Sequence, residues 1–274
     1  MKIISYLGHG IAHERSGIPC QDACGSRSAP NGNVVAVLSD GASHAAYAAV
    51  AAQETVTAVL DYFTQFSLGG SDFVPQDFVD FCRARLLLKQ ESLGMPAIQH
   101  LSATLVFAVI SEKYILIGHL GDGTIIALSP DGDTILHSQP EAHPEIPNGT
   151  YFVISPQAPE HLRFYCYDRR EQPVDLLLLS SDGPYEMLCN RGNGNPVATA
   201  RELQHYIRDC GLRTQEDLAD VLNQMAEVPV ERFDDWSLLI WSNALHPDQS
   251  SESPILHSMY QEEMEKYHAG MQKG

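Results

Sequence analysis

The sequence predicts an α+β domain, in which helices lie beside antiparallel strands. Between residues 102 and 137, four apolar runs follow one another with only short turn signals between them, which is typical of antiparallel strands. Apolar residues recur at intervals of three and four in segment 45–63, which is typical of a helix. The 274 residues are 44% hydrophobic, so the chain can bury a sizeable core.

Each expected strand is a short apolar run bounded by turn-forming residues. The expected strands are residues 2–8, 33–39, 102–110, 113–120, 123–129, 133–137, 162–168, 174–180 and 236–241. Residues 174–180 (VDLLLLS) are apolar almost throughout, which indicates a strand buried on both faces. Asp131, in SPDGD, is expected to form only a hairpin turn.

Four helices are expected within the domain. The first follows Ser43 as its N-cap and carries the Ala-rich segment 45–63. The second, residues 76–92, begins after Pro75. The last two are residues 198–210 and 215–227, and Thr214 caps the latter with Asp217 at its third position.

The chain is expected to divide into one domain, residues 1–243, and a C-terminal extension, residues 244–274. Residues 243–254 are polar and rich in Pro and Ser, which marks a linker. Beyond the linker, a mostly apolar stripe at helical spacing predicts a helical tail. The stripe consists of Leu256, Met259, Tyr260, Glu263, Met264 and Tyr267.

Charge excludes two classes of partner. The chain has 17 Lys and Arg against 35 Asp and Glu, a formal net charge of −18, which repels nucleic acid and anionic membranes. No apolar run approaches the roughly 20 residues that span a bilayer, and the apolar residues 3–7 are too few for a signal peptide. We therefore expect a soluble cytoplasmic protein.

The six cysteines are expected to be reduced thiols that act as small buried hydrophobes. They are Cys20, Cys24, Cys82, Cys166, Cys189 and Cys210. Only Cys20 and Cys24 are close in sequence, and no second Cys or His pair completes the ligand spacing of a structural zinc site.

Aspartates at strand ends are the candidates for chemistry. Asp40 and Asp182 each end a strongly apolar strand, and Asp22, Asp122 and Asp235 lie in other turns or strand ends. A single Asp of this kind is usually explained by a turn, because Asp-Gly is a common turn dipeptide. Asp40 and Asp182 do not fit that explanation, because each ends a strongly apolar strand and is followed by what reads as a connection to a helix. Several carboxylates at one sheet rim would repel one another, and a divalent cation with oxygen ligands would relieve that repulsion.

The order of five motifs resembles the metal-dependent protein phosphatase family, type 2C. The motifs are VLSDGAS before an Ala-rich helix, SATLVFAVI, GHLGDG, LLLLSSDG and DDWSLLIW, and the resemblance covers roughly residues 1–241. The opening GHGIAHERSGIPCQDAC resembles a bacterial subgroup in which PCQDA follows a Ser/Thr-His element. Each motif is short, and their order and spacing carry the resemblance.

The resemblance implies a four-layer α-β-β-α sandwich with two antiparallel sheets and a metal cleft at one edge. It also implies two Mn²⁺ or Mg²⁺ ions, with Asp40 bridging them and the Gly41 carbonyl as a further ligand. Asp182 and Asp235 would complete the coordination of one ion. Asp22 would act on the other, directly or through water, and Asp122 would help to hold a weaker third ion. Asp40, Asp182 and Asp235 would thus be the catalytic residues.

Three departures from the family pattern affect the site. Gln21 stands where many members have Glu, which removes a negative charge from the first motif. The arginine that often precedes that motif has no close counterpart, so Arg15 or His13 is the candidate phosphate contact. Ala42 stands where animal members often carry His, and no general acid is assigned.

The leading hypothesis is a phosphoserine/phosphothreonine protein phosphatase, in which water between two metal ions attacks the phosphomonoester. Its partners would be a phosphorylated protein substrate and a partner kinase. No Cys has an Arg six positions later, which disfavours a cysteine phosphatase. The alternative is a weak or inactive module that binds phosphoproteins, and the net charge disfavours a metal-dependent nuclease.

Overall fold

The computed structural model describes residues 3–65, 73–147, 149–189, 195–212, 214–225 and 234–245. The expected linker and helical tail, residues 244–274, lie outside this part of the chain except for their first two residues.

Within the described residues, ten strands form two five-stranded sheets in which every neighbouring pair is antiparallel. The first sheet has the order β1 (Ile3–Gly8), β10 (Trp236–Ser242), β9 (Leu176–Ser180), β6 (Thr124–Leu128) and β7 (Thr134–Ser138). The second has the order β2 (Asp22–Ser28), β3 (Val34–Asp40), β4 (Leu105–Ile110), β5 (Tyr114–Leu120) and β8 (Arg163–Asp168).

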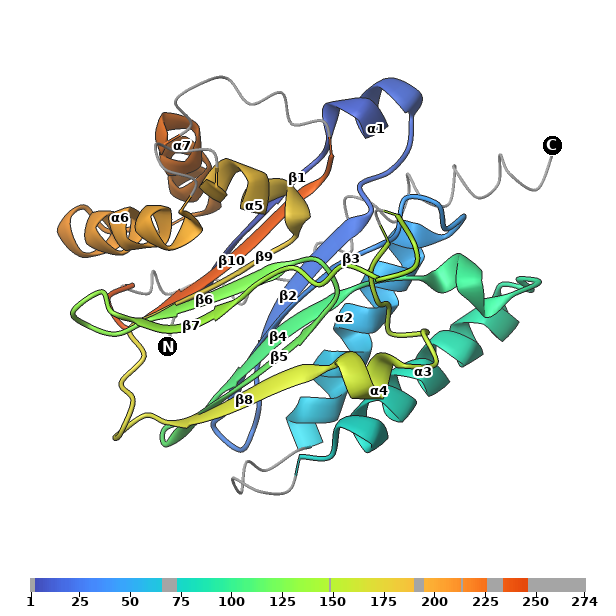
Figure 1. Cartoon of the computed structure of the whole chain (residues 1–274), viewed down its shortest axis with the longest axis horizontal. Helices are drawn as coiled ribbons and strands as arrows, with labels where there is room; N and C mark the ends of the chain where they lie inside the picture. The colour runs from blue at the N-terminus through green and yellow to red at the C-terminus, as the bar shows by residue number, and fades with distance from the viewer. Residues whose placement is uncertain are drawn as a thin grey trace.

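Helices cover the outer face of each sheet, so the domain has the expected four layers (Figure 1). The second sheet carries α2 (Ala48–Gln65) and α3 (Pro75–Ser92). The first sheet carries α5 (Asp182–Cys189), α6 (Pro196–Asp209) and α7 (Gln215–Met225). Shorter elements are α1 (Ile11–Ser16), the 3-10 helix η1 (Ile98–Leu101) and α4 (Ala158–His161).

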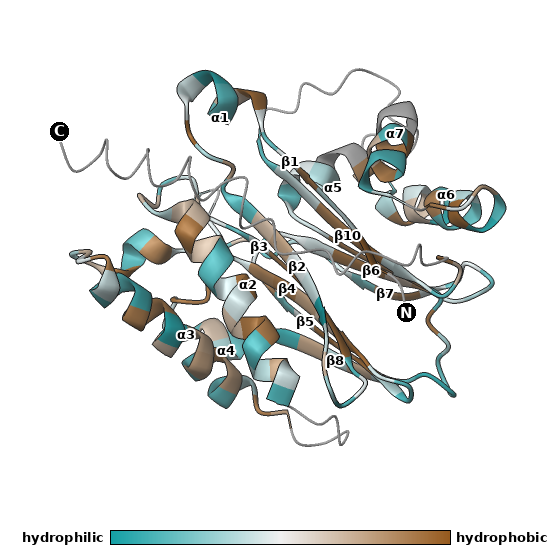
Figure 2. Cartoon of the chain, turned by 180° about the vertical axis from the view of Figure 1, so that it is seen from behind, coloured by the Kyte–Doolittle hydropathy of each residue, from teal (hydrophilic) through white to brown (hydrophobic). Residues whose placement is uncertain are grey.

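Successive side chains of a strand point to opposite faces of its sheet, so the described interior divides into three apolar layers. In β4, Phe107 faces the helices α2 and α3, whereas Val106 faces the opposite sheet. In β9, Leu178 packs against α6 and α7, and Leu177 packs between the sheets. These strands are therefore hydrophobic on both faces, and Figure 2 shows the brown of hydrophobic residues along the central strands. The doubly buried strand expected at residues 174–180 is confirmed.

Turn and cap chemistry explains where several elements begin. Thr214 Oγ1 accepts from the Asp217 N–H and Asp217 Oδ2 accepts from the Thr214 N–H, both at 3.1 Å, so the expected capping box is confirmed. The hairpin turn expected at Asp131 joins β6 and β7, where Gly132 takes a φ of 80°.

The expected cap at Ser43 was wrong, because α2 begins only at Ala48. The preceding backbone bonds to the segment around η1 instead: Ala42 N–H donates to the Ser102 carbonyl and Tyr47 N–H donates to that of His100. Strand β2 and helix α1 were not predicted, because DACGSRS and IAHERS lack a clear apolar period. In the part of the chain that the structure describes, no helix combines the length and hydrophobicity needed to cross a membrane.

Candidate metal centre

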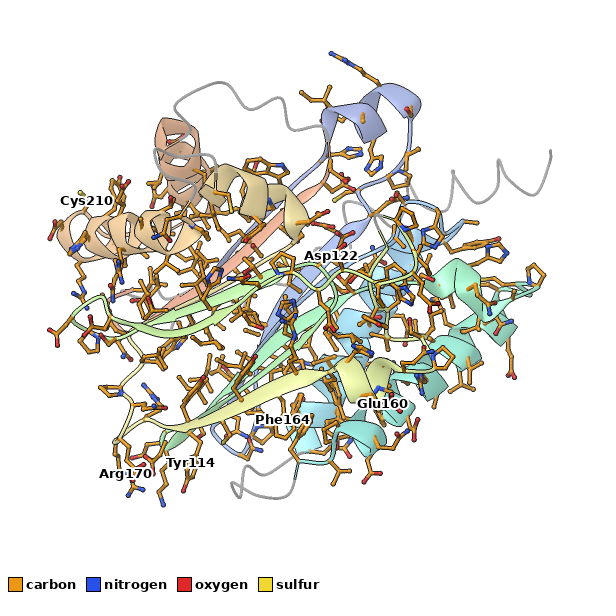
Figure 3. All side chains as sticks on the ribbon, in the orientation of Figure 1. Tyr114, Asp122, Glu160, Phe164, Arg170 and Cys210 are labelled. Carbon is orange, nitrogen blue, oxygen red and sulfur yellow. The ribbon has the colours of Figure 1, made fainter. Side chains whose placement is uncertain are left out.

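A cleft of about 330 Å³ opens where several strand ends meet. Register brings these ends together, because Ser180 at the end of β9 pairs with Thr124 of β6 and Leu238 of β10. Asp122 lies at this end of the sandwich in Figure 3, whereas Tyr114 and Arg170 lie at the other. The cleft is lined by Gln21, Asp40, Gly41, Ala42, Ser43, His44, Thr104, Asp122, Ile146, Pro147, Gly149, Thr150, Phe152, Asp182 and Asp234.

Asp40 ends β3 and is held by Thr104 of the neighbouring segment. Its N–H donates to Thr104 Oγ1 at 3.1 Å, and the Thr104 N–H donates to the Asp40 carbonyl at 2.8 Å. Gly41 follows, and a Cβ there would lie 2.2 Å from the Ala48 carbonyl oxygen at the start of α2. Only glycine therefore lets the chain leave β3 this close to the helix.

Asp122 reaches the cleft from a connection between the two sheets, and Asp182 reaches it from the end of the first sheet. Asp122 lies in the turn between β5 and β6, where Gly121 takes a φ of 113°. Asp182 is the first residue of α5, two positions after the end of β9, and its charge helps to raise the pKa of Asp40. Two of the predicted site residues thus line one cleft although 142 positions separate them in the sequence.

Asp22 begins β2 directly opposite Asp40 in the register of the second sheet. Its side chain is buried and does not line the cleft. Asp22 Oδ2 accepts from Ser237 Oγ of β10 at 2.6 Å. Asp22 therefore lies behind the cleft and links the two sheets.

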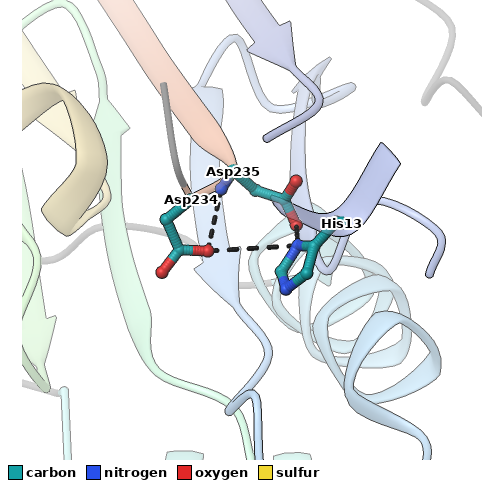
Figure 4. A group of neighbouring side chains, drawn as sticks. All are labelled: His13, Asp234 and Asp235. Carbon is teal, nitrogen blue, oxygen red and sulfur yellow. Dashed lines mark hydrogen bonds and ion pairs between the residues drawn. The ribbon is translucent and has the colours of Figure 1, made fainter. Parts of the chain in front are cut away.

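The structure separates Asp234 from Asp235. Asp234 lines the cleft, with 59% of its side chain exposed, whereas the Asp235 side chain is 2% exposed and does not line it. Asp235 instead accepts hydrogen bonds from the backbone N–H groups of Gly10 and Gln21, at 2.8 and 2.6 Å. Figure 4 shows the two carboxylates pointing in different directions.

Neither candidate phosphate contact lines the cleft. His13 Nδ1 is hydrogen-bonded to Asp235 Oδ2 at 2.8 Å and lies 4.0 Å from Asp234 Oδ1. Arg15 is exposed on the last turn of α1. Among the described lining residues there is no Lys or Arg, so neither type of side chain balances the carboxylates on the wall of the cleft.

Burial and mutual repulsion raise the pKa of the clustered carboxyl groups. Burial first, and then Asp22 and Asp182, raise the pKa of Asp40 well above its ordinary value. Burial, followed by the charges of Asp122 and Asp234, raises the pKa of Asp182 to about 7. Burial raises the pKa of Asp22 to about 8 against the hydrogen bond from Ser237, and Asp235 and Asp182 add to the rise.

The residues present fit a divalent cation. Gln21 Oε1 and Asp122 Oδ1 are buried with no hydrogen-bond partner in the described part of the protein, and such oxygens are costly unless a ligand takes them. Carboxylate, amide and carbonyl oxygens are the donors that Mg²⁺ and Mn²⁺ prefer. Cations would also relieve the repulsion among the carboxylates.

Sequence reasoning missed Asp234, Thr104 and the wall formed by Ile146, Pro147, Gly149, Thr150 and Phe152. Asp234 and Asp235 are adjacent before β10, and nothing local in FDDWS tells which one reaches the cleft. The wall lies between β7 and α4, where no strand or helix pattern occurs. Glu141 anchors this segment through His161 Nδ1, which lies 2.7 Å from Glu141 Oε1.

A sequence model of the protein phosphatase 2C family matches residues 9–223. The match covers most of the chain, so the protein belongs to the protein phosphatase 2C family. It includes Asp22, Asp40, Asp122 and Asp182 and ends before Asp234. The family is the one that the order of motifs resembled, and the narrower subgroup suggested by PCQDA stays a prediction. A search of curated protein sequences finds no significant match to this chain.

Solved structures of the same fold come from bacterial phosphatases and a related protein. A bacterial serine phosphatase matches with a TM-score of 0.64 and 16% identity over 91% of this chain and 100% of its own. The serine/threonine phosphatase Stp1 from Staphylococcus aureus matches with a TM-score of 0.63 and 15% identity over 88% of this chain and 94% of its own. RsbX in complex with magnesium matches with a TM-score of 0.54 and 12% identity over 87% of this chain and 92% of its own. At these identities the likeness establishes the fold.

Proposed function

We propose that this protein is a metal-dependent phosphatase that hydrolyses phosphoserine and phosphothreonine monoesters in proteins. The observation that carries the proposal is the convergence of Asp40, Asp122, Asp182 and Asp234 on one cleft that has no Lys or Arg among its described lining residues. Membership of the protein phosphatase 2C family supports the same activity. The magnesium bound by RsbX, a protein of the same fold, is consistent with a cation here.

In a binuclear Mn²⁺ or Mg²⁺ centre at this cleft, Asp40 would be the ligand shared by the two ions. The raised pKa of Asp40, to which Asp22, Asp182, Asp122 and Asp234 all contribute after burial, supports that central position. Asp182 and the Gly41 carbonyl would be further ligands of these ions, and Asp122 would help to hold a weaker third ion. Asp234 takes the role that the sequence suggested for Asp235, because Asp234 lines the cleft.

Cations at such a site supply a water nucleophile at neutral pH and neutralise the phosphoryl oxygens. The chain's own part is to hold the ligands in place. Thr104 fixes the backbone of Asp40, and Ser237 fixes the carboxylate of Asp22 behind it. Because the described lining residues include no Arg or Lys, binding of the phosphoryl group depends on the cations, and we assign no phosphate contact to Arg15 or His13.

The second candidate is a weak or inactive module that binds phosphoproteins in a regulatory assembly. The neutral Gln21 and the missing cationic phosphate contact favour it. The two functions differ in whether phosphate esters are hydrolysed when metal is supplied.

Hydrolysis of p-nitrophenyl phosphate and of a phosphothreonine peptide, with and without Mn²⁺, tests the proposal. We expect wild-type activity that requires Mn²⁺, and a loss on the order of 100-fold or more in Asp40→Asn. Asp175→Asn is the matched control, because Asp175 is also a buried hydrogen-bonded aspartate but precedes β9, at the end of that strand away from Asp182. Full turnover in Asp40→Asn, or a wild type inert at every metal concentration, would reject the proposal.

A further inference from the structure

Asp235 lies beside a cleft residue, yet its own carboxylate is bound by the protein. Oδ1 accepts from the Gly10 N–H at 2.8 Å, and Oδ2 accepts from the Gln21 N–H at 2.6 Å. His13 Nδ1 lies 2.8 Å from the same Oδ2 (Figure 4). An ionised carboxylate has about four acceptor positions, so three of them are occupied by donors of this chain. Asp235 therefore has little left to offer a cation.

The three donors come from the N-terminal segment, more than 200 residues away in sequence. Gly10 connects β1 to α1, His13 lies within α1, and Gln21 precedes β2. Gln21 also lines the cleft, and its Oε1 is buried with no hydrogen-bond partner among the described residues. The Asp235 carboxylate thus joins the segment that carries Asp234 to the segment that carries Gln21.

Two glycines let the surrounding backbone close around this junction. A Cβ at Gly10 would lie 2.4 Å from the Asp234 carbonyl carbon, and a Cβ at Gly183 would lie 2.5 Å from the Asp235 carbonyl oxygen. The backbone of Asp234 and Asp235 is therefore packed against β1–α1 on one side and the start of α5 on the other. That start carries Asp182, another cleft residue.

We propose that Asp235 and His13 form a positioning pair, which aligns Asp234 and Gln21 toward the divalent cations without contacting those cations. The inference rests on the proposed function, because it assigns a role within the same metal centre. His13 orients the Asp235 carboxylate from the solvent side, and Asp235 fixes the two segments that present the cleft oxygens. Residues that orient metal ligands in this way typically change metal affinity 10–100-fold when they are replaced.

Titration of the apo protein with Mn²⁺ in a calorimeter, together with the apo melting temperature, tests the pair. We expect His13→Ala and Asp235→Ala each to weaken Mn²⁺ binding about 10-fold or more. His13→Asn should restore most of the affinity, because the Asn Nδ2 sits in the same place along the side chain as His Nδ1. The double variant should bind no more weakly than Asp235→Ala, since both residues act through one hydrogen bond.

Asp175→Ala is the matched control for a purely structural effect. Asp175 is buried and accepts from Gln204 Nε2 at 2.9 Å and Arg208 Nη2 at 2.7 Å, outside the cleft. The Asp175→Ala substitution should lower the melting temperature and leave Mn²⁺ affinity unchanged.

Three results would overturn the inference. Unchanged Mn²⁺ affinity in His13→Ala would reduce His13 to a structural residue, even if Asp235→Ala failed to fold. Equal weakening in His13→Ala and His13→Asn would remove the hydrogen bond as the cause. A wild type that binds no Mn²⁺ would overturn the proposed function and the positioning pair together, whereas normal wild-type binding with unchanged variants would overturn the pair alone.

Discussion

Gln21 is the residue at which the metal centre departs most clearly from the family pattern. Its Oε1 is a buried oxygen without a described partner, next to a cluster of carboxylates. An amide oxygen can coordinate a cation or orient its water, but it lacks the charge of a carboxylate. The cleft is therefore expected to hold at least one cation more weakly than a site with Glu at this position.

Gln21→Glu should lower the Mn²⁺ concentration for half-maximal hydrolysis by about 10-fold, because a further negative charge is added near the cation. The apo variant should also melt at a lower temperature, since another carboxylate joins a repelling cluster. Metal titration of activity and thermal unfolding of the apo protein measure the two effects. An unchanged metal requirement would place residue 21 outside the metal coordination, and activity that appears only in the variant would indicate a decayed phosphatase.

The choice between Asp234 and Asp235 marks the limit of sequence reasoning at this scale. Asp40, Asp122 and Asp182 were predictable because each follows an apolar strand and is itself followed by Gly. Asp234 and Asp235 share the same local sequence, and what distinguishes them is that Asp235 accepts from donors of Gly10, His13 and Gln21. Such long-range contacts leave no local sequence pattern.

At the scale of elements, strands with clear apolar runs were predictable and those without were not. Strand β4 matched its expected position because LVFAVI is buried on both faces. Strand β2 has little apolar pattern and forms an edge that pairs in its sheet only with β3. Its place depends on β3 and on Asp22 meeting Ser237, neither of which the segment itself encodes.

The pairing of β4 with β5 predicts a sharp effect of one glycine. Gly118 lies opposite Phe107, and a Cβ at Gly118 would lie 2.1 Å from Phe107 Cε1 in a fully buried layer. Gly118→Ala should therefore reduce the free energy of unfolding by about 1–3 kcal/mol, measured by urea denaturation. Its Mn²⁺ affinity should stay that of the wild type.

Phe107→Leu provides the matched background for Gly118→Ala. A smaller side chain at position 107 leaves room for the added methyl group, so Gly118→Ala should cost less in this background than in the wild type. Equal costs in both backgrounds would mean that contact with Phe107 is not the cause.

For the whole molecule, the carboxylate cluster makes stability depend on pH and metal. The pKa of Asp182 is raised to about 7 and that of Asp22 to about 8, against about 4 in an unfolded chain. Between these values the folded apo protein holds protons that the unfolded chain releases. Stability is therefore greatest below about pH 4 for these groups and is lost as the pH rises through 7 to 8.

The apo protein should consequently melt at a lower temperature at pH 8 than at pH 5, by on the order of 5 °C. Millimolar Mn²⁺ or Mg²⁺ should raise the melting temperature at pH 8, because a ligand that binds only the native state stabilises it. Asp182→Asn should flatten the pH dependence, which separates the cluster from the general repulsion of a chain with net charge −18. A melting temperature indifferent to metal would favour the inactive module.

The location of bound metal tests the binuclear centre most directly. Crystals soaked in Mn²⁺ and measured at the manganese absorption edge should give two anomalous peaks about 3.5–4 Å apart in the cleft. Asp40 should lie between the peaks, with Asp182 and Asp234 touching them and Asp235 still bound to Gly10, His13 and Gln21. An empty cleft, or a single peak held by Asp235, would contradict a binuclear centre built on Asp40.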